Sequence, residues 1–215
     1  VGHGLGAVPK MIISKDRDAT SNVATWRVYH ASLGNTKYLT LDNNEGAGTF
    51  TDWDDTTPTS TVYSVGGSGG YTPTNTSSTE YISYVFAEVQ GFSRIHAYTG
   101  NGNASGPFVW CGFQPAWVLI KQSTNNTGDG WHLIDNTRDP SNRVAGGSYH
   151  KLFPDVTNAE SASVAIGIDL LSNGFKVRAT DGGLNADTKI YTFIAFAHHP
   201  FVTSDDGGSI PTTAR

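Results

Sequence analysis

The densest group of chemically useful side chains is Asp52-Trp53-Asp54-Asp55, in which carboxylates flank an indole ring. An exposed indole can stack on the C–H face of a sugar ring while neighbouring carboxylates accept hydrogen bonds from its hydroxyl groups. Trp53, Asp52 and Asp54 are therefore predicted to bind a ligand, together with Tyr71. Two alternatives stay open. Trp53 folds back onto the core, or the acids form a solvated turn, because the glycine and glutamate of a calcium loop are missing.

The other reactive patterns favour structural roles. Gly2-His3-Gly4-Leu5-Gly6 lacks the preceding strand and following helix of a phosphate-binding loop. His198-His199 on a strand would point to opposite faces and could not share one ion. Cys111 follows Trp110 in an apolar stretch, which indicates a buried structural thiol, and a single cysteine forms no internal disulfide. We expect no metal ion, no cofactor and no catalytic residue.

A polysaccharide-degrading enzyme would need two carboxylates about 5 to 10 Å apart in a cleft. Five carboxylates lie in or near predicted strands, and no pair stands out among them. They are Glu80, Glu88, Asp135, Glu160 and Asp169. Enzymatic activity is therefore the weakest of the functional hypotheses.

Composition narrows the class of protein. Charged residues make up 15% of the 215-residue chain, and the net charge is −5. An average soluble domain has about 25% charged residues. The chain has no excess of positive charge that could attract a phosphate backbone, which argues against nucleic-acid binding. No stretch approaches the roughly 20 apolar residues of a membrane span, so we expect no membrane insertion.

The elements that must position these residues are short β-strands. β-branched and aromatic runs alternate with clusters of Gly, Asn, Asp, Pro and Thr, which is typical of all-β folds such as sandwiches and jelly rolls. The predicted strands are Lys10–Lys15, Trp26–Ala31, Tyr38–Asp42, Thr61–Val65, Glu80–Val89, Trp117–Gln122, Trp131–Asp135, His150–Phe153, Ile166–Leu171, Gly174–Ala179 and Ile190–His198.

Three local patterns give sharper expectations. Tyr81–Phe86 has apolar residues at both parities, which predicts a central strand covered on both faces. Ser172-Asn173-Gly174 predicts a tight hairpin, because Asn-Gly tolerates positive φ. Asn158–Val164 is the one segment with helical potential.

The chain contains the same motif set twice. Pro9 to Lys15 corresponds to Pro115 to Lys121 at an offset of 106 residues, Trp26 to Trp131 at 105, and Tyr81–Ala87 to Tyr191–Ala197 at 110. We therefore predict two tandem β-sandwich modules, jelly-roll-like and related by internal duplication. The first repeat covers residues 1–90. Residues 91–215 hold a connecting strand or loop, the second repeat and a C-terminal tail. The sequence leaves open whether the repeats are separate sandwiches or share strands.

These motifs carry a resemblance. Tyr98-Thr99-Gly100-Asn101-Gly102, the run Phe108–Lys121, and Leu171–Val177 resemble the repeat unit of bacteriophage tail-fibre and related virion proteins, especially those of marine phages. The resemblance covers nearly the whole chain, although family endings usually have an acid where His198 stands. Because the second copy has an upstream stretch that the first lacks before Val1, we expect this chain to be a piece of a longer polypeptide.

The resemblance implies a tail-fibre or virion structural module at the virion surface, outside cells. It implies contacts with other virion proteins, a homo-oligomer for which a trimer is plausible, and attachment to a host-surface glycan or protein. It supplies no catalytic residues. The alternative is a purely structural decoration or filament subunit without a specific ligand.

Overall fold

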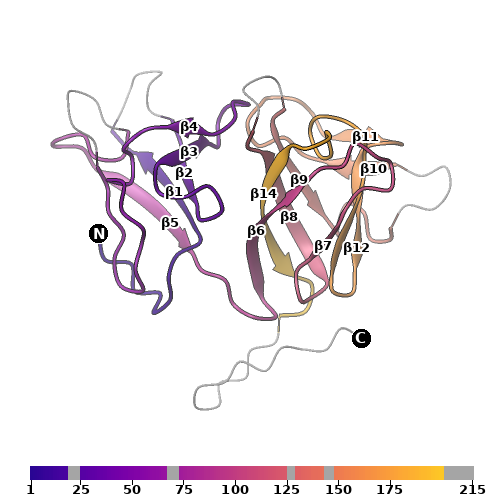
Figure 1. Cartoon of the computed structure of the whole chain (residues 1–215), viewed down its shortest axis with the longest axis horizontal. Helices are drawn as coiled ribbons and strands as arrows, with labels where there is room; N and C mark the ends of the chain where they lie inside the picture. The colour runs from indigo at the N-terminus through magenta and orange to yellow at the C-terminus, as the bar shows by residue number, and fades with distance from the viewer. Residues whose placement is uncertain (19–24, 67–72, 125–128, 143–147, 201–215) are drawn as a thin grey trace, which may run out of the picture. The chain divides into compact units, whose positions relative to one another are not determined.

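The computed structural model describes residues 1–18, 25–66, 73–124, 129–142 and 148–200. In these ranges the regular structure consists of fourteen strands, and no helix occurs. The prediction of an all-β protein is confirmed. The chain divides into two compact units, Val1–Ala87 and a second one that begins at Glu88 (Figure 1).

The first unit contains one antiparallel sheet with the strand order β4-β3-β2-β1-β5. The core on one face of this sheet contains Ile12, Tyr29, Trp53 and Tyr63. The strands are β1 Met11–Asp16, β2 Arg27–His30, β3 Lys37–Thr40, β4 Gly48–Thr49 and β5 Tyr81–Phe86.

Two expectations for this unit are wrong. The strand predicted at Thr61–Val65 is only an isolated bridge between Val62 and Gly2. Strand β5 lies at the end of its sheet, and its residues Ile82 and Tyr84 are 38% and 47% exposed. Its apolar residues at both parities resembled those of a central strand, but in the described residues only β1 pairs with it.

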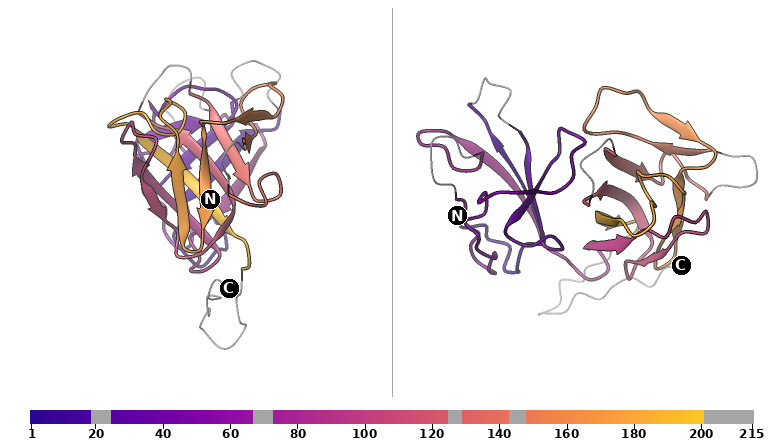
Figure 2. Two further views of the ribbon diagram at one scale, coloured as in Figure 1. Left: turned by 90° about the vertical axis from the view of Figure 1, so that its right-hand side faces the viewer. Right: turned by 45° about the horizontal axis from the view of Figure 1, so that its top comes forward.

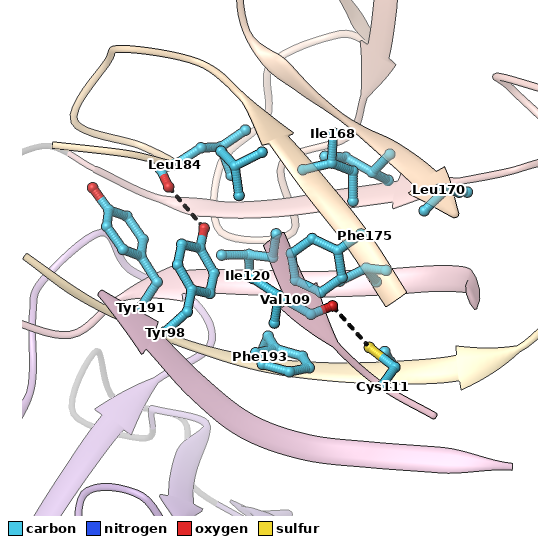
Figure 3. Packing of buried hydrophobic residues seen from close by; sticks show 14 of the residues in the cluster. Tyr98, Val109, Cys111, Ile120, Ile168, Leu170, Phe175, Leu184, Tyr191 and Phe193 are labelled. Carbon is cyan, nitrogen blue, oxygen red and sulfur yellow. Dashed lines mark hydrogen bonds between the residues drawn. The ribbon is translucent and has the colours of Figure 1, made fainter. Parts of the chain in front are cut away.

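The second unit is a sandwich of a four-stranded sheet, β6-β14-β8-β9, and a three-stranded sheet, β12-β13-β7, with a small β10-β11 hairpin (Figures 1 and 2). Both sheets contribute to one hydrophobic core (Figure 3). The strands are β6 Ser93–Thr99, β7 Phe108–Trp110, β8 Pro115–Gln122, β9 Trp131–Asp135, β10 Tyr149–Lys151, β11 Ser161–Ser163, β12 Gly167–Leu171, β13 Gly174–Arg178 and β14 Ile190–Ala197.

Local patterns in the second unit are only partly as expected. The β12–β13 hairpin forms, but Asn173 does not have positive φ. Gly174 is needed for another reason, because a Cβ there would collide with the carbonyl oxygen of Val109 on the neighbouring strand. The segment with helical potential instead forms β11, since pairing with β10 overrides a weak helix propensity.

The two units share a strand order and a register. β1 pairs with β2 and β5 in the first unit, as β8 pairs with β9 and β14 in the second. Ile12 lies opposite Tyr29 and Val85. Val118 lies opposite Ile134 and Ala195, and these residues have the sequence offsets of the two motif copies. Corresponding positions in the two units are therefore defined by the pairing itself.

Candidate functional site

The predicted acidic and aromatic cluster is not an exposed surface. The Trp53 side chain is 1% exposed and packs edge-on against Tyr29, with ring centroids 5.6 Å apart. Its assignment as an exposed ligand-binding ring is corrected, because the indole lies in the apolar core beside β2. Asp52 is also buried, whereas Asp54 is exposed in a turn with φ of 51°. Tyr71 lies outside the described residues.

Asp52 has a structural partner. Its Oδ2 atom lies 3.6 Å from Nε of Arg27, and the Arg27 guanidinium lies 3.9 Å from the centre of the Tyr38 ring. Burial raises the pKa of Asp52 to about 6, and the positive charge of Arg27 opposes this shift. The carboxylate is therefore an element of the first unit's interior that titrates near neutral pH.

The first unit also contains a pocket of about 450 Å³ above the core-facing side of β1 and β5. Its walls are mostly neutral hydroxyl groups and aliphatic carbons. Oγ of Ser83 donates to Oγ of Ser14 at 3.0 Å across the floor, and the backbone amide of Thr76 donates to the Tyr81 hydroxyl at 2.9 Å. The lining residues are Val1, Gly2, His3, Ser14, Tyr63, Val65, Thr74, Asn75, Tyr81, Ser83 and Val85.

The second unit presents two exposed aromatic rings that we did not predict as ligand-binding residues. Phe108 and Trp110 are 45% and 55% exposed, on the same side of β7, while Val109 between them is buried. The Arg94 guanidinium lies 5.1 Å from the Trp110 ring centre, and Nε of Arg94 is 3.4 Å from Oε1 of Glu88. We call Phe108 and Trp110 the aromatic platform.

A buried polar cluster lies at the ends of strands in the second unit. Nζ of Lys121 donates to the carbonyl oxygen of Asp129 at 2.6 Å. Burial, followed by the charges of Lys151 and Lys121, lowers the pKa of His132 to about 3, so its imidazole is neutral. Burial also raises the pKa of Asp181, which lies near Lys151. The cluster therefore connects strands β8, β9 and β10 to the loops that contain Asp129 and Asp181.

The remaining candidates have structural surroundings. Cys111 is buried as expected, and burial raises the pKa of its thiol to about 12. Asp135 and Glu160 both bind Arg138, which places a cation between the carboxylates. The strand ends before His198 and His199, so their rings approach to 4.0 Å instead of pointing apart. Among the described residues, no group of three or more His, Cys, Asp or Glu side chains could hold a metal ion.

The comparisons with known proteins give one match. Residues 1–200 match a family described as "Domain of unknown function (DUF7483)", and the chain belongs to this family. No curated protein matches the chain. No solved structure matches it. A search of the described residues for a helix able to cross a membrane found none.

Proposed function

We propose that this chain is a structural module of a virion or tail-fibre protein and contributes to host-surface attachment by binding a glycan on the aromatic platform. One observation carries the proposal: Phe108 and Trp110 project into solvent from the same side of an edge strand. Exposed aromatic faces stack on the C–H groups of sugar rings. Contact with other virion proteins and assembly into a homo-oligomer belong to the same proposal, which gives the chain no catalytic role.

The platform is held in position before a ligand arrives. Trp110 has the Arg94 guanidinium near its ring, and a Cβ on Gly112 would lie 3.0 Å from the indole. Gly112 therefore lets the ring lie close over the backbone. A ring fixed in this way loses little conformational entropy on binding, and the Arg94 guanidinium, which lies over the ring, supplies hydrogen-bond donors beside it.

The proposal also includes two jelly-roll-like repeats that arose by duplication. Its support is the shared strand order, β5-β1-β2 and β14-β8-β9, in the same register. A repeated β scaffold is well suited to a virion protein, because similar modules can be joined along one chain.

A glycan array probed with the labelled chain tests attachment. We expect binding to one class of glycan, reduced at least about tenfold by Trp110→Ala. Val156→Ala, a change at another exposed apolar residue of the second unit, serves as the matched control and should bind like the unaltered chain. An array without binding, or binding that survives Trp110→Ala, contradicts the proposed site. Mass spectrometry of purified particles tests the virion assignment separately.

A purely structural role is the second candidate. It is favoured by exposed apolar residues other than the aromatic platform, such as Ile82 and Tyr84 on β5 of the first unit. A negative array combined with presence of the chain in purified particles would support this alternative.

A further inference from the structure

The pocket of the first unit corresponds to a filled position in the second. Ser14 and Ser83 pair on the pocket floor, and the corresponding pair in the second unit is Ile120 and Phe193. Tyr81 on the pocket wall corresponds to Tyr191 at the same offset as Ser83 to Phe193. Ile120, Phe193 and Tyr191 are all buried members of the second core.

In the second unit this position is filled by Tyr98 of β6 (Figure 3). Its ring stacks on Tyr191 with centroids 5.0 Å apart, and Tyr98 also contacts Phe193 at 6.4 Å. The Tyr98 hydroxyl donates to the carbonyl oxygen of Leu184 at 2.7 Å. In the first unit the residue at the Leu184 offset is Thr74, which also lines the pocket.

The loop beside each tyrosine has the same conformation in both units. The Thr76 amide donates to the Tyr81 hydroxyl at 2.9 Å, and the Ala186 amide donates to the Tyr191 hydroxyl at 2.8 Å. Ser78 and Thr188, which correspond in sequence, have φ of 61° and 62°. Residues with a Cβ rarely adopt this conformation. The first unit therefore holds the loop in the shape that receives β6 in the second.

That loop in the second unit binds the residues that follow Tyr98. The Asn101 amide donates to Oδ1 of Asn185 at 2.9 Å, and Nδ2 of Asn185 donates to the Asn103 carbonyl oxygen at 2.8 Å. Gly102 has φ of 63°, and a Cβ on Gly100 would collide with the Ala186 carbonyl oxygen. The residue corresponding to Asn185 is Asn75, which is exposed and lines the pocket.

The strand beside the pocket offers the matching edge. β14 pairs along its length with β6, whereas its counterpart β5 is the last strand of its sheet in the described residues. On β14, Thr192 and Ile194 lie opposite Ala97 and Ile95. The corresponding residues Ile82 and Tyr84 are exposed on β5, so an added strand would cover apolar side chains there and place a tyrosine over Tyr81.

We infer that the first unit is a receptor for an extended polypeptide strand that pairs with β5 and inserts a tyrosine ring into the pocket. The occupant has the chemistry of β6 and its loop: a tyrosine followed by Thr-Gly-Asn-Gly. Backbone pairing with the sheet edge provides affinity, and the pocket selects the side chain. This site shares no residue with the aromatic platform, so it is independent of the proposed glycan contact.

Fluorescence anisotropy with a labelled, end-capped peptide of residues 93–102, SRIHAYTGNG, added to the full chain tests the inference. We expect saturable binding with one peptide per chain. The same peptide with Tyr98→Ala should bind at least about tenfold more weakly, since it loses both ring burial and stacking. Absence of saturable binding, or equal affinity for both peptides, overturns the inference.

Variants of the full chain locate the peptide. Ser83→Lys places a charged side chain in the pocket floor, where the second unit has the apolar Phe193, and it should abolish binding while circular dichroism stays unchanged. Asn75→Ala alters an exposed side chain and should weaken binding several-fold, whereas the matched change Asn158→Ala at an exposed position of the second unit should not. Unchanged binding by both pocket variants overturns the site.

Two competing occupants are distinguished in the same experiment. Displacement of the peptide by millimolar neutral monosaccharides would identify a sugar pocket and overturn the strand. A chain that is dimeric in sedimentation, and that Ser83→Lys converts to a monomer, would identify a second copy as the occupant and would also overturn the proposal. We expect neither result.

Discussion

The core-facing sides of β1 and β8 have the same register but different side chains. Ser14 and Ser83 face a pocket in the first unit, whereas Ile120 and Phe193 are packed in the second. The difference shows that strand pairing decides which positions face inward. The size of the side chains at those positions, and the presence of a strand such as β6, decide whether the space is filled.

Removal of the Tyr98 ring from the core of the second unit should have the largest effect on stability. Tyr98→Ala deletes a buried aromatic group and should destabilise the second unit by about 4 kcal/mol, in the range for large-to-small core changes. Tyr98→Phe, the control, loses only the hydrogen bond to Leu184 and should cost about 1 kcal/mol. Hydrogen exchange of β8 and β14 amides measures both. If both variants have equally small effects, Tyr98 does not fill in the second unit the space that is a pocket in the first.

Asp52 in the first unit and His132 in the second should contribute to the acid response of their units in opposite directions. The folded pKa of Asp52, about 6, exceeds its unfolded value. Its contribution to the stability of the first unit is therefore present at low pH and is lost as pH rises from about 4 through about 6. The folded pKa of His132, about 3, lies below its unfolded value. Its contribution to the second unit is present above about 6.5 and is lost as pH falls.

Each group can change the stability of its unit by at most about 1.4 kcal/mol per pH unit. Hydrogen exchange of β1 and β8 amides between pH 4 and 7, corrected for intrinsic rates, measures the two slopes. Asp52→Asn should make the slope of the first unit more positive, and His132→Gln should make that of the second unit less positive, because each removes one titrating group. Changes of slope with the same sign in the two variants would contradict the assignments.

The first unit can be given the core residues that the second unit has at the corresponding positions. Replacing Ser14 and Ser83 together by isoleucine and phenylalanine should stabilise that unit by about 1 kcal/mol, as cavity-filling changes do. Either single change should stabilise less, because it leaves the other hydroxyl without its hydrogen-bond partner. Urea unfolding of the singles and the double provides a double-mutant cycle. Additive effects would show that the two positions do not share one space.

The smallest expected effect concerns the shared loop. Ser78→Gly and Thr188→Gly should each stabilise their own unit by up to about 1 kcal/mol, because glycine adopts positive φ without a steric cost. The gain should be larger at Thr188, which is β-branched. Thermal unfolding of the two variants and of Thr79→Gly as a control measures it. A loss of stability at either position would argue against equivalent loops.

Most strands could be predicted because their residues suit only one local structure. Met11–Asp16, Trp131–Asp135 and Gly174–Arg178 are β-branched or aromatic runs bounded by turn residues. Their pairing partners could not be predicted, since a strand's apolar pattern does not identify its neighbour. For that reason the sequence predicts a central strand at Tyr81–Phe86, although only β1 pairs with it in the part of the chain that the structure describes.

The exposed aromatic residues were harder to predict than the fold. Trp53 lies among acids in the sequence, yet its ring packs on Tyr29, because the chain returns over the sheet at a point that local composition does not encode. Trp110 lies in an apolar run and is exposed, because β7 is an edge strand that buries one side only. Exposure depends on tertiary neighbours, which residue type alone does not reveal.

The composition of β5 has a practical consequence for handling the protein. Tyr81-Ile82-Ser83-Tyr84-Val85-Phe86 contains no charged residue and no proline, the features that usually protect a sheet margin from intermolecular pairing. Short uncharged segments of high β propensity promote aggregation when exposed. Purified material should therefore precipitate in a concentration-dependent manner, and a lysine in place of Tyr84 should improve solubility.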